Sequence, residues 1–132
     1  MANSLRLLLD TNVFIWSAVE PRKLSSAAAA VIADPDVFRT VSVVTVWEMQ
    51  IKNAVGKLPL KENADRTAAR FARELRAEFL APSLAHVAEL ERLPRIHDDP
   101  FDRMLIAQAI TEGLTIVTAD HIFSQYPVSI LW

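Results

Sequence analysis

Acidic side chains stand beside strongly apolar sequence at four points in the chain, at Asp10, Glu48, Asp102 and Asp120. Carboxylates that gather at one place repel each other, and their pKa values rise unless cations are present. Clusters of oxygen ligands suit Mg²⁺ or Mn²⁺, ions that activate a water and offset the charge of a phosphoryl group. If the fold brings these acids together, they predict metal-assisted hydrolysis of a phosphodiester.

Three of these acids also have a purely structural interpretation within their own stretch of sequence. Asp10 and Asp120 can each cap a following helix, because a short acidic side chain accepts hydrogen bonds from the first free backbone N–H groups. Glu48 stands three residues after Thr45, which is the spacing of a capping box. Each stretch by itself is therefore explained by a helix cap as well as by a metal ligand.

The stretch "HDDPFDRMLIAQA", residues 97–109, poses the same choice for the fourth acid. Asp99 is a good N-cap and Pro100 suits the first helical position. Asp102 follows within the first turn, where an acid favours the positive end of the helix dipole. We assign Asp99 to the cap and Asp102 to the metal, and Asp98 to a solvated loop.

Apolar strand-like runs alternate with helix-like stretches along the whole chain. Such alternation predicts an α/β fold with a parallel sheet covered on both faces, in one domain spanning residues 1–132. In such sheets, ligands bind beyond the carboxyl ends of the strands, where Asp10 and Asp120 are expected. Strands are expected at 5–10, 36–42, 79–83, 114–120 and 127–132, and helices at 12–19, 26–34, 43–55, 64–79, 84–93 and 100–112.

The composition excludes several classes of site. The chain has no cysteine, so disulfides, a thiol nucleophile and a thiolate zinc site are absent, and a cytoplasmic location is expected. Its two glycines exclude a Gly-rich phosphate loop. No apolar run is long enough to span a membrane, so no membrane association is expected. With a net charge of −2, binding of nucleic acid requires a local basic strip or metal ions.

Four stretches in this order, "LLLDTNVFIW", "VSVVTVWEMQIK", "HDDPFDRMLIAQA" and "TIVTAD", resemble PIN-domain ribonucleases, and more narrowly the VapC-type toxins of bacterial and archaeal toxin–antitoxin pairs. The resemblance runs from near residue 5 to near residue 131. It implies a three-layer α/β/α sandwich with a five-stranded parallel sheet, and a metal-dependent endonuclease that cuts RNA.

The resemblance also implies a set of site residues and partners. The acidic ligands of Mg²⁺ or Mn²⁺ would be Asp10, Glu48, Asp102 and Asp120, which would also be the catalytic residues. Asn12 and Thr118 would orient a ligand carboxylate or a water, and Thr11 would do the same or cap a helix. The implied partners are RNA, a VapB-like antitoxin whose C-terminal segment packs over this side of the fold, and a second copy of the chain. Trp16 and Trp47 would then be either core residues or anchors for a partner.

Substrate-binding residues are not identified by the sequence. Basic residues with the right position along the chain to hold an RNA backbone are Lys52, Lys57, Arg66, Arg70, Arg73, Arg76 and Arg103. The histidines His86, His97 and His121 could serve an acid–base ribonuclease, but each is more simply explained as an ordinary surface or core residue.

Two other functions remain open at this point. A PIN-like module could bind RNA or a partner without cutting, although the presence of all four acids argues against it. An aspartate-based phosphatase of the haloacid-dehalogenase type would need a second acid two residues after Asp10, where the chain has Asn12.

Overall fold

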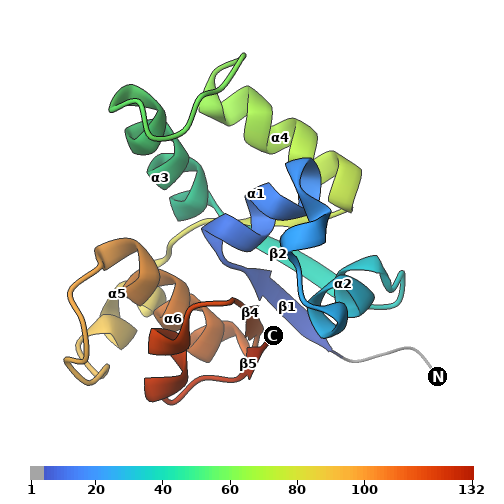
Figure 1. Ribbon diagram of the computed structural model, residues 1–132. Coiled ribbons are helices and arrows are strands. Elements are labelled where there is room, and N and C mark those ends of the chain that lie inside the picture. Colours follow the sequence, from blue (N-terminus) through green and yellow to red (C-terminus); the bar gives the residue numbers. More distant parts are fainter. Residues whose placement is uncertain (1–4) are drawn as a thin grey trace.

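A computed structural model describes residues 5–132, in which five parallel strands form one sheet in the order β3-β2-β1-β4-β5 (Figure 1). The strands are β1 (Arg6–Leu9), β2 (Phe38–Ser42), β3 (Glu78–Leu80), β4 (Thr115–Val117) and β5 (Ile130–Leu131). The helices are α1 (Thr11–Val19), α2 (Ser26–Ala33), α3 (Val43–Ala54), α4 (Ala64–Leu75), α5 (Leu84–Leu90) and α6 (Pro100–Glu112), with short 3-10 helices η1 (Pro21–Lys23) and η2 (His121–Gln125). The predicted five-stranded parallel sheet is confirmed.

The central strand β1 shows how the three layers arise from the sequence. Leu7, Leu8 and Leu9 are fully buried, and successive side chains of a strand point to opposite faces. Leu7 and Leu9 join a core cluster with α1, α2 and α4, whereas Leu8 joins a second cluster with α6 and η2. Helices therefore cover both faces of the sheet, as Figure 1 shows. An unbroken apolar run is what a strand buried on both faces requires.

Two expected helices are too long, and the one expected at 84–93 ends at Leu90 as α5. The sequence predicted a helix at 64–79, but α4 ends at Leu75, and Arg76 adopts a left-handed conformation with φ 54°. The chain then enters β3, where Phe79 pairs with Val41 of β2. Residues 76–79 are compatible with a helix or with a strand, and pairing with the edge of the sheet overrides their local helix propensity. The short strand expected near 79–83 is confirmed, although it begins one residue earlier and ends sooner.

The carboxyl ends of the strands lead almost directly into helices. Asp10 alone separates β1 from α1, and Ser42 is both the last residue of β2 and the N-cap of α3. The Asp10 backbone N–H donates to the Val117 carbonyl at 3.1 Å, so the ends of β1 and β4 stay level. These short connections fix the side chains at this edge of the sheet with little freedom.

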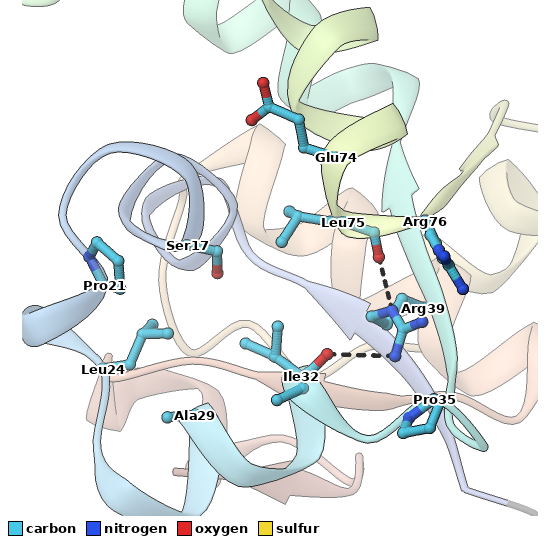
Figure 2. A pocket seen from close by; sticks show the side chains of 11 residues that line it. Ser17, Pro21, Leu24, Ala29, Ile32, Pro35, Arg39, Glu74, Leu75 and Arg76 are labelled. Atoms are coloured by element: carbon cyan, nitrogen blue, oxygen red, sulfur yellow. Dashed lines mark hydrogen bonds between the residues drawn. The ribbon is translucent and has the colours of Figure 1, made fainter.

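A pocket of about 410 Å³ lies away from this edge, among α1, α2, α4 and the amino-terminal half of β2 (Figure 2). Arg39 is only 7% exposed there, and no acidic side chain of residues 5–132 forms an ion pair with it. Its guanidinium donates to the carbonyls of Leu75 at 2.7 Å, Ile32 at 3.2 Å and Asp34 at 2.6 Å. Those carbonyls lie at the C-terminal ends of α4 and α2, where a cation is favoured. Arg39 therefore ties two helix ends together.

Among the described residues, no helix is both long enough and apolar enough to cross a membrane.

Candidate active site

Asp10 divides its two carboxylate oxygens between a helix cap and the neighbouring strand. Oδ1 accepts from the Val13 backbone N–H at 2.7 Å, and Oδ2 accepts from the Thr118 hydroxyl at 2.5 Å. The side chain is nearly covered, at 7% exposure of the residue. Burial raises the pKa of Asp10 to about 6, against the two hydrogen bonds, and the negative charges of Glu48 and Asp120 raise it further. The capping interpretation of Asp10 is confirmed, and its raised pKa also marks it as a functional candidate.

Glu48 does not belong to a capping box. Helix α3 begins at Val43, where the Ser42 hydroxyl caps it by accepting from the Val44 N–H at 3.1 Å. The capping interpretation of Glu48 with Thr45 is therefore wrong, because the helix starts before Thr45.

Glu48 instead makes one long-range contact, with Thr11, and one local contact, with Lys52. Its Oε1 accepts from the Thr11 hydroxyl at 2.6 Å, and its Oε2 pairs with Lys52 Nζ at 3.1 Å. Thr11 also lies 3.1 Å from the Thr45 hydroxyl, and it is the first residue of α1 rather than its cap. Thr11 therefore orients Glu48, which was one of the two roles that its position allowed.

Asp102 is not used to cap its helix. Asp99 caps α6 by accepting from the N–H groups of Phe101 at 2.9 Å and Asp102 at 3.0 Å, so the predicted cap is confirmed. The Asp102 carboxylate lies beside His97, with 3.1 Å between Oδ2 and Nε2. Burial raises the pKa of Asp102 to about 6 despite the His97 hydrogen bond, and the charges of Asp99 and Glu48 add to the rise.

Asp120 is the most exposed of the four acids. Its Oδ1 caps η2 by accepting from the Ile122 N–H at 3.0 Å, as the sequence predicted. Its backbone N–H donates to the Thr118 hydroxyl at 3.1 Å, and the same hydroxyl donates to Asp10. Thr118, which is 2% exposed, thus joins two of the acids through one oxygen.

The fold brings all four acids to the carboxyl edge of the sheet. The charge of Glu48 acts on both Asp10 and Asp102, and the charge of Asp120 acts on Asp10. Within residues 5–132, however, no three acidic or histidine side chains are grouped closely enough to hold a metal ion as they lie. Protein groups hold these carboxylates instead. Lys52 forms an ion pair with Glu48, and His97 is hydrogen-bonded to Asp102.

The chemistry of this donor set fits Mg²⁺ or Mn²⁺. All four side chains offer carboxylate oxygens, which are the ligands that these ions prefer. Two of the carboxyl groups are destabilised as anions by burial and by their neighbours' charge, and a bound cation would relieve both.

The other residues that the sequence singled out differ in exposure and in their contacts. Asn12 is exposed on α1, and within residues 5–132 no hydrogen bond joins its side chain to the acids. Trp16 is half-buried, with its ring centroid 6.2 Å from that of Trp132. Trp47 is 58% exposed and lies edge-on to Phe101 at 5.1 Å, so it is not a core residue.

The structural interpretation of His86 is confirmed, since it is 1% exposed and forms a capping box with Ser83. Its Nε2 lies 2.8 Å from Glu112 Oε2, and neither contact involves the four acids. Arg103, a candidate for holding RNA, instead donates to the carbonyl of Pro94 at 2.9 Å.

Sequence reasoning missed Tyr126 as a neighbour of the site and considered Lys52 only as an RNA contact. Lys52 follows Glu48 by four residues on one helix, and that spacing does predict an ion pair. Tyr126 comes 29 residues after His97, and no local pattern connects the two.

Known proteins resemble this chain in sequence and in structure. The family model of the PIN domain matches residues 7–128. Ribonuclease VapC22 of Mycobacterium tuberculosis is 30% identical over 115 residues, which cover 86% of this chain and 86% of that protein.

Two solved structures share the fold at lower identity. VapBC2 from Rickettsia felis, bound to a DNA fragment from its promoter, superposes with a TM-score of 0.72 at 17% identity, covering 96% of this chain and 98% of that one. DNA-bound VapBC from Salmonella typhimurium gives 0.65 at 19% identity, covering 96% and 97%. The extent of the family match and the identity to the mycobacterial protein together lead to one conclusion: the chain belongs to the PIN domain family.

Proposed function

We propose that this chain is a metal-dependent endoribonuclease that hydrolyses RNA phosphodiesters, and that it acts as the toxin of a toxin–antitoxin pair. The observation that carries the proposal is the gathering of Asp10, Glu48, Asp102 and Asp120 at one edge of the sheet, with the pKa of Asp10 raised to about 6. The sequence relative at 30% identity is a ribonuclease, which supports the same activity.

The four acids are the proposed ligands of Mg²⁺ or Mn²⁺. When bound, such an ion lowers the pKa of a water and offsets the charge on a phosphoryl group. Thr118 holds Oδ2 of Asp10, and Thr11 holds Oε1 of Glu48, so two carboxylates are oriented before any ion arrives. When water attacks the phosphorus and the bond to the 3′-oxygen breaks, the products are a 5′-phosphate and a 3′-hydroxyl, and the RNA 2′-hydroxyl is not required as a nucleophile.

Lys52 is the proposed contact for the RNA backbone at this site. Its side chain is 37% exposed, and its Nζ lies 3.1 Å from Oε2 of Glu48. When an ion takes up the charge of Glu48, the lysine becomes available to pair with a phosphate.

The proposed protein partners are an antitoxin and a second copy of the chain. Large apolar side chains are exposed at four-residue spacing along α3 and at its C-cap: Val43 (42%), Trp47 (58%), Ile51 (41%) and the C-cap Val55 (62%). Large apolar side chains exposed in a row mark protein interaction surfaces. The relatives of known structure include toxin–antitoxin complexes, and the cytoplasm is the proposed location.

One observation favours a second candidate, a PIN module that binds RNA or a partner without cutting. Lys52 pairs with Glu48, and His97 is hydrogen-bonded to Asp102, so both carboxylates have partners without an ion. An aspartate-based phosphatase is less consistent with the site, because both oxygens of Asp10 accept hydrogen bonds and the second acid of that class is replaced by Asn12.

The test is cleavage of total cellular RNA by the purified protein, freed of any partner, with Mn²⁺ and with the ends of the fragments mapped. Controls are EDTA, Asp10→Asn, and Asp36→Asn as a matched substitution in an exposed loop away from the site. Discrete cuts with 5′-phosphates that persist in Asp36→Asn and disappear in the other two controls are expected.

Two results would contradict the proposal. Cuts that end in cyclic phosphates and persist in EDTA would indicate acid–base chemistry by histidine. RNA that is bound equally with and without Mn²⁺ and stays intact would indicate the binding module.

A further inference from the structure

The hydroxyl of Tyr126 lies among three polar groups of His97 and Arg103, next to Asp102. Tyr126 is the chain's one tyrosine and follows η2, and it is 4% exposed, with its ring in the core cluster under α6. Its oxygen lies 2.6 Å from His97 Nδ1, 3.2 Å from the His97 backbone nitrogen and 3.1 Å from an Arg103 guanidinium nitrogen. His97 in turn reaches Asp102.

The directions of these hydrogen bonds follow from the chemistry of the groups. A guanidinium and a backbone N–H can only donate, so the Tyr126 oxygen accepts from Arg103 and from the His97 backbone. These two hydrogen bonds use both lone pairs of the oxygen. The hydroxyl therefore donates its own proton in a hydrogen bond to the third neighbour, His97 Nδ1. Nδ1 is therefore an acceptor and carries no proton.

The tautomer of His97 is settled by the same argument. A neutral imidazole without a proton on Nδ1 carries it on Nε2. Nε2 lies 3.1 Å from Oδ2 of Asp102, a carboxylate oxygen that can accept the proton in a hydrogen bond. A chain of donation thus runs from Arg103 through Tyr126 and His97 to Asp102.

We propose that Tyr126 is a positioning residue for the metal centre: its hydroxyl keeps His97 in the Nε2–H tautomer, which holds Asp102 by Oδ2 and leaves Oδ1 for a cation. This inference rests on the proposed function, in which Asp102 is a metal ligand. Partners that orient a ligand in this way tune metal affinity, and their loss typically weakens binding about 10–100-fold.

The variant Tyr126→Phe removes only the oxygen. The ring contacts remain available, since His97 lies edge-on to it at 5.4 Å and Arg103 lies 5.9 Å from its centroid. Without the hydroxyl, Nδ1 has no donor facing it, and the imidazole can take the other tautomer or turn. Asp102 then loses its fixed donor.

Two measurements on the full chain test the inference. The first is the ¹⁵N spectrum of the histidine rings in EDTA, for wild type and Tyr126→Phe. His97 is expected to give the Nε2–H pattern in the wild type and a shifted or mixed pattern in the variant. His86, whose Nδ1 accepts from the Ser83 N–H far along the chain from Tyr126, is the internal reference and is expected to keep its signals.

The second measurement is Mn²⁺ affinity by calorimetry in a double-mutant cycle with His97→Gln. The glutamine amide can donate to Asp102 without help from the tyrosine. We expect Tyr126→Phe to weaken Mn²⁺ binding about tenfold in the wild-type background and to have no further effect beside His97→Gln.

The outcomes separate this inference from the proposed function. Unchanged His97 signals in Tyr126→Phe, or an equal loss of Mn²⁺ affinity in both backgrounds, would overturn the positioning role while leaving the metal site in place. A wild type that binds no Mn²⁺ would overturn the proposed function, and with it the role of Tyr126 in metal binding.

Discussion

Replacing Asp10 by asparagine is expected to stabilise the metal-free protein at neutral pH while it abolishes metal binding. Burial raises the pKa of Asp10 from 3.8 to about 6, so the folded protein disfavours the ionised side chain. Asparagine has nearly the same shape and carries no charge. Its oxygen can accept from the Val13 N–H, and its amide can donate to the Thr118 hydroxyl, so both existing contacts have replacements.

The size and the pH window of the effect follow from the pKa of Asp10. The rise of the pKa from 3.8 to about 6 corresponds to about 3 kcal/mol. The folded pKa lies above the unfolded value, so the folded state binds the proton more tightly. The stability of the wild type therefore falls as pH rises from about 4 to about 6, and it levels off above that range. The advantage of Asp10→Asn should grow across the same window.

Urea unfolding in EDTA from about pH 4 to about pH 8 measures this difference. Asp36→Asn, in an exposed loop, is the matched control and should give a constant difference from wild type. Adding Mn²⁺ at about 100 times its Kd should stabilise the wild type by about 2.7 kcal/mol and leave Asp10→Asn unchanged. A difference between Asp10→Asn and wild type that does not vary with pH would refute the reasoning.

Three further substitutions have expected outcomes. Thr118→Val removes the hydroxyl that donates to Asp10, and should cost about 2 kcal/mol in urea unfolding at neutral pH and weaken Mn²⁺ binding, with Thr118→Ser restoring both. Arg39→Met leaves three helix-end carbonyls without their donor and should lower the free energy of unfolding by about 3 kcal/mol. The RNA cleavage rate of the folded protein should not change. An unchanged unfolding midpoint would count against the structural role of Arg39. Arg76→Gly relieves a left-handed backbone and should raise the free energy of unfolding by about 1 kcal/mol, whereas a loss would show that the arginine side chain stabilises this turn.

Local chemistry made parts of the fold predictable. The unbroken run of leucines in β1 indicated burial on both faces, and the structure places Leu7 and Leu8 in opposite layers. Asp99 and Pro100 marked the start of α6 because capping depends on residues that are neighbours in the chain. Gly113 ends the same helix at φ 70°, a conformation that glycine adopts without strain.

The failures occurred where distant contacts compete with local preference. The residues after Leu75 have no strong signal that ends a helix, and pairing of β3 with β2 ends it. Thr45 and Glu48 have the spacing of a capping box, yet Ser42 starts the helix earlier because β2 ends there. Neither outcome can be read from a window of a few residues.

The sequence by itself determined which acids are available, which strand ends and helix starts carry them, and that the oxygens suit a hard cation. Only the tertiary structure decided which distant side chains hold these carboxylates. Thr118 reaches Asp10 across 108 residues, and Tyr126 faces His97 across 29, because parallel strands and the turn after β4 bring distant segments to one edge. Hydrogen bonds depend on distances in space, and those were fixed by the sheet rather than by the order of the residues.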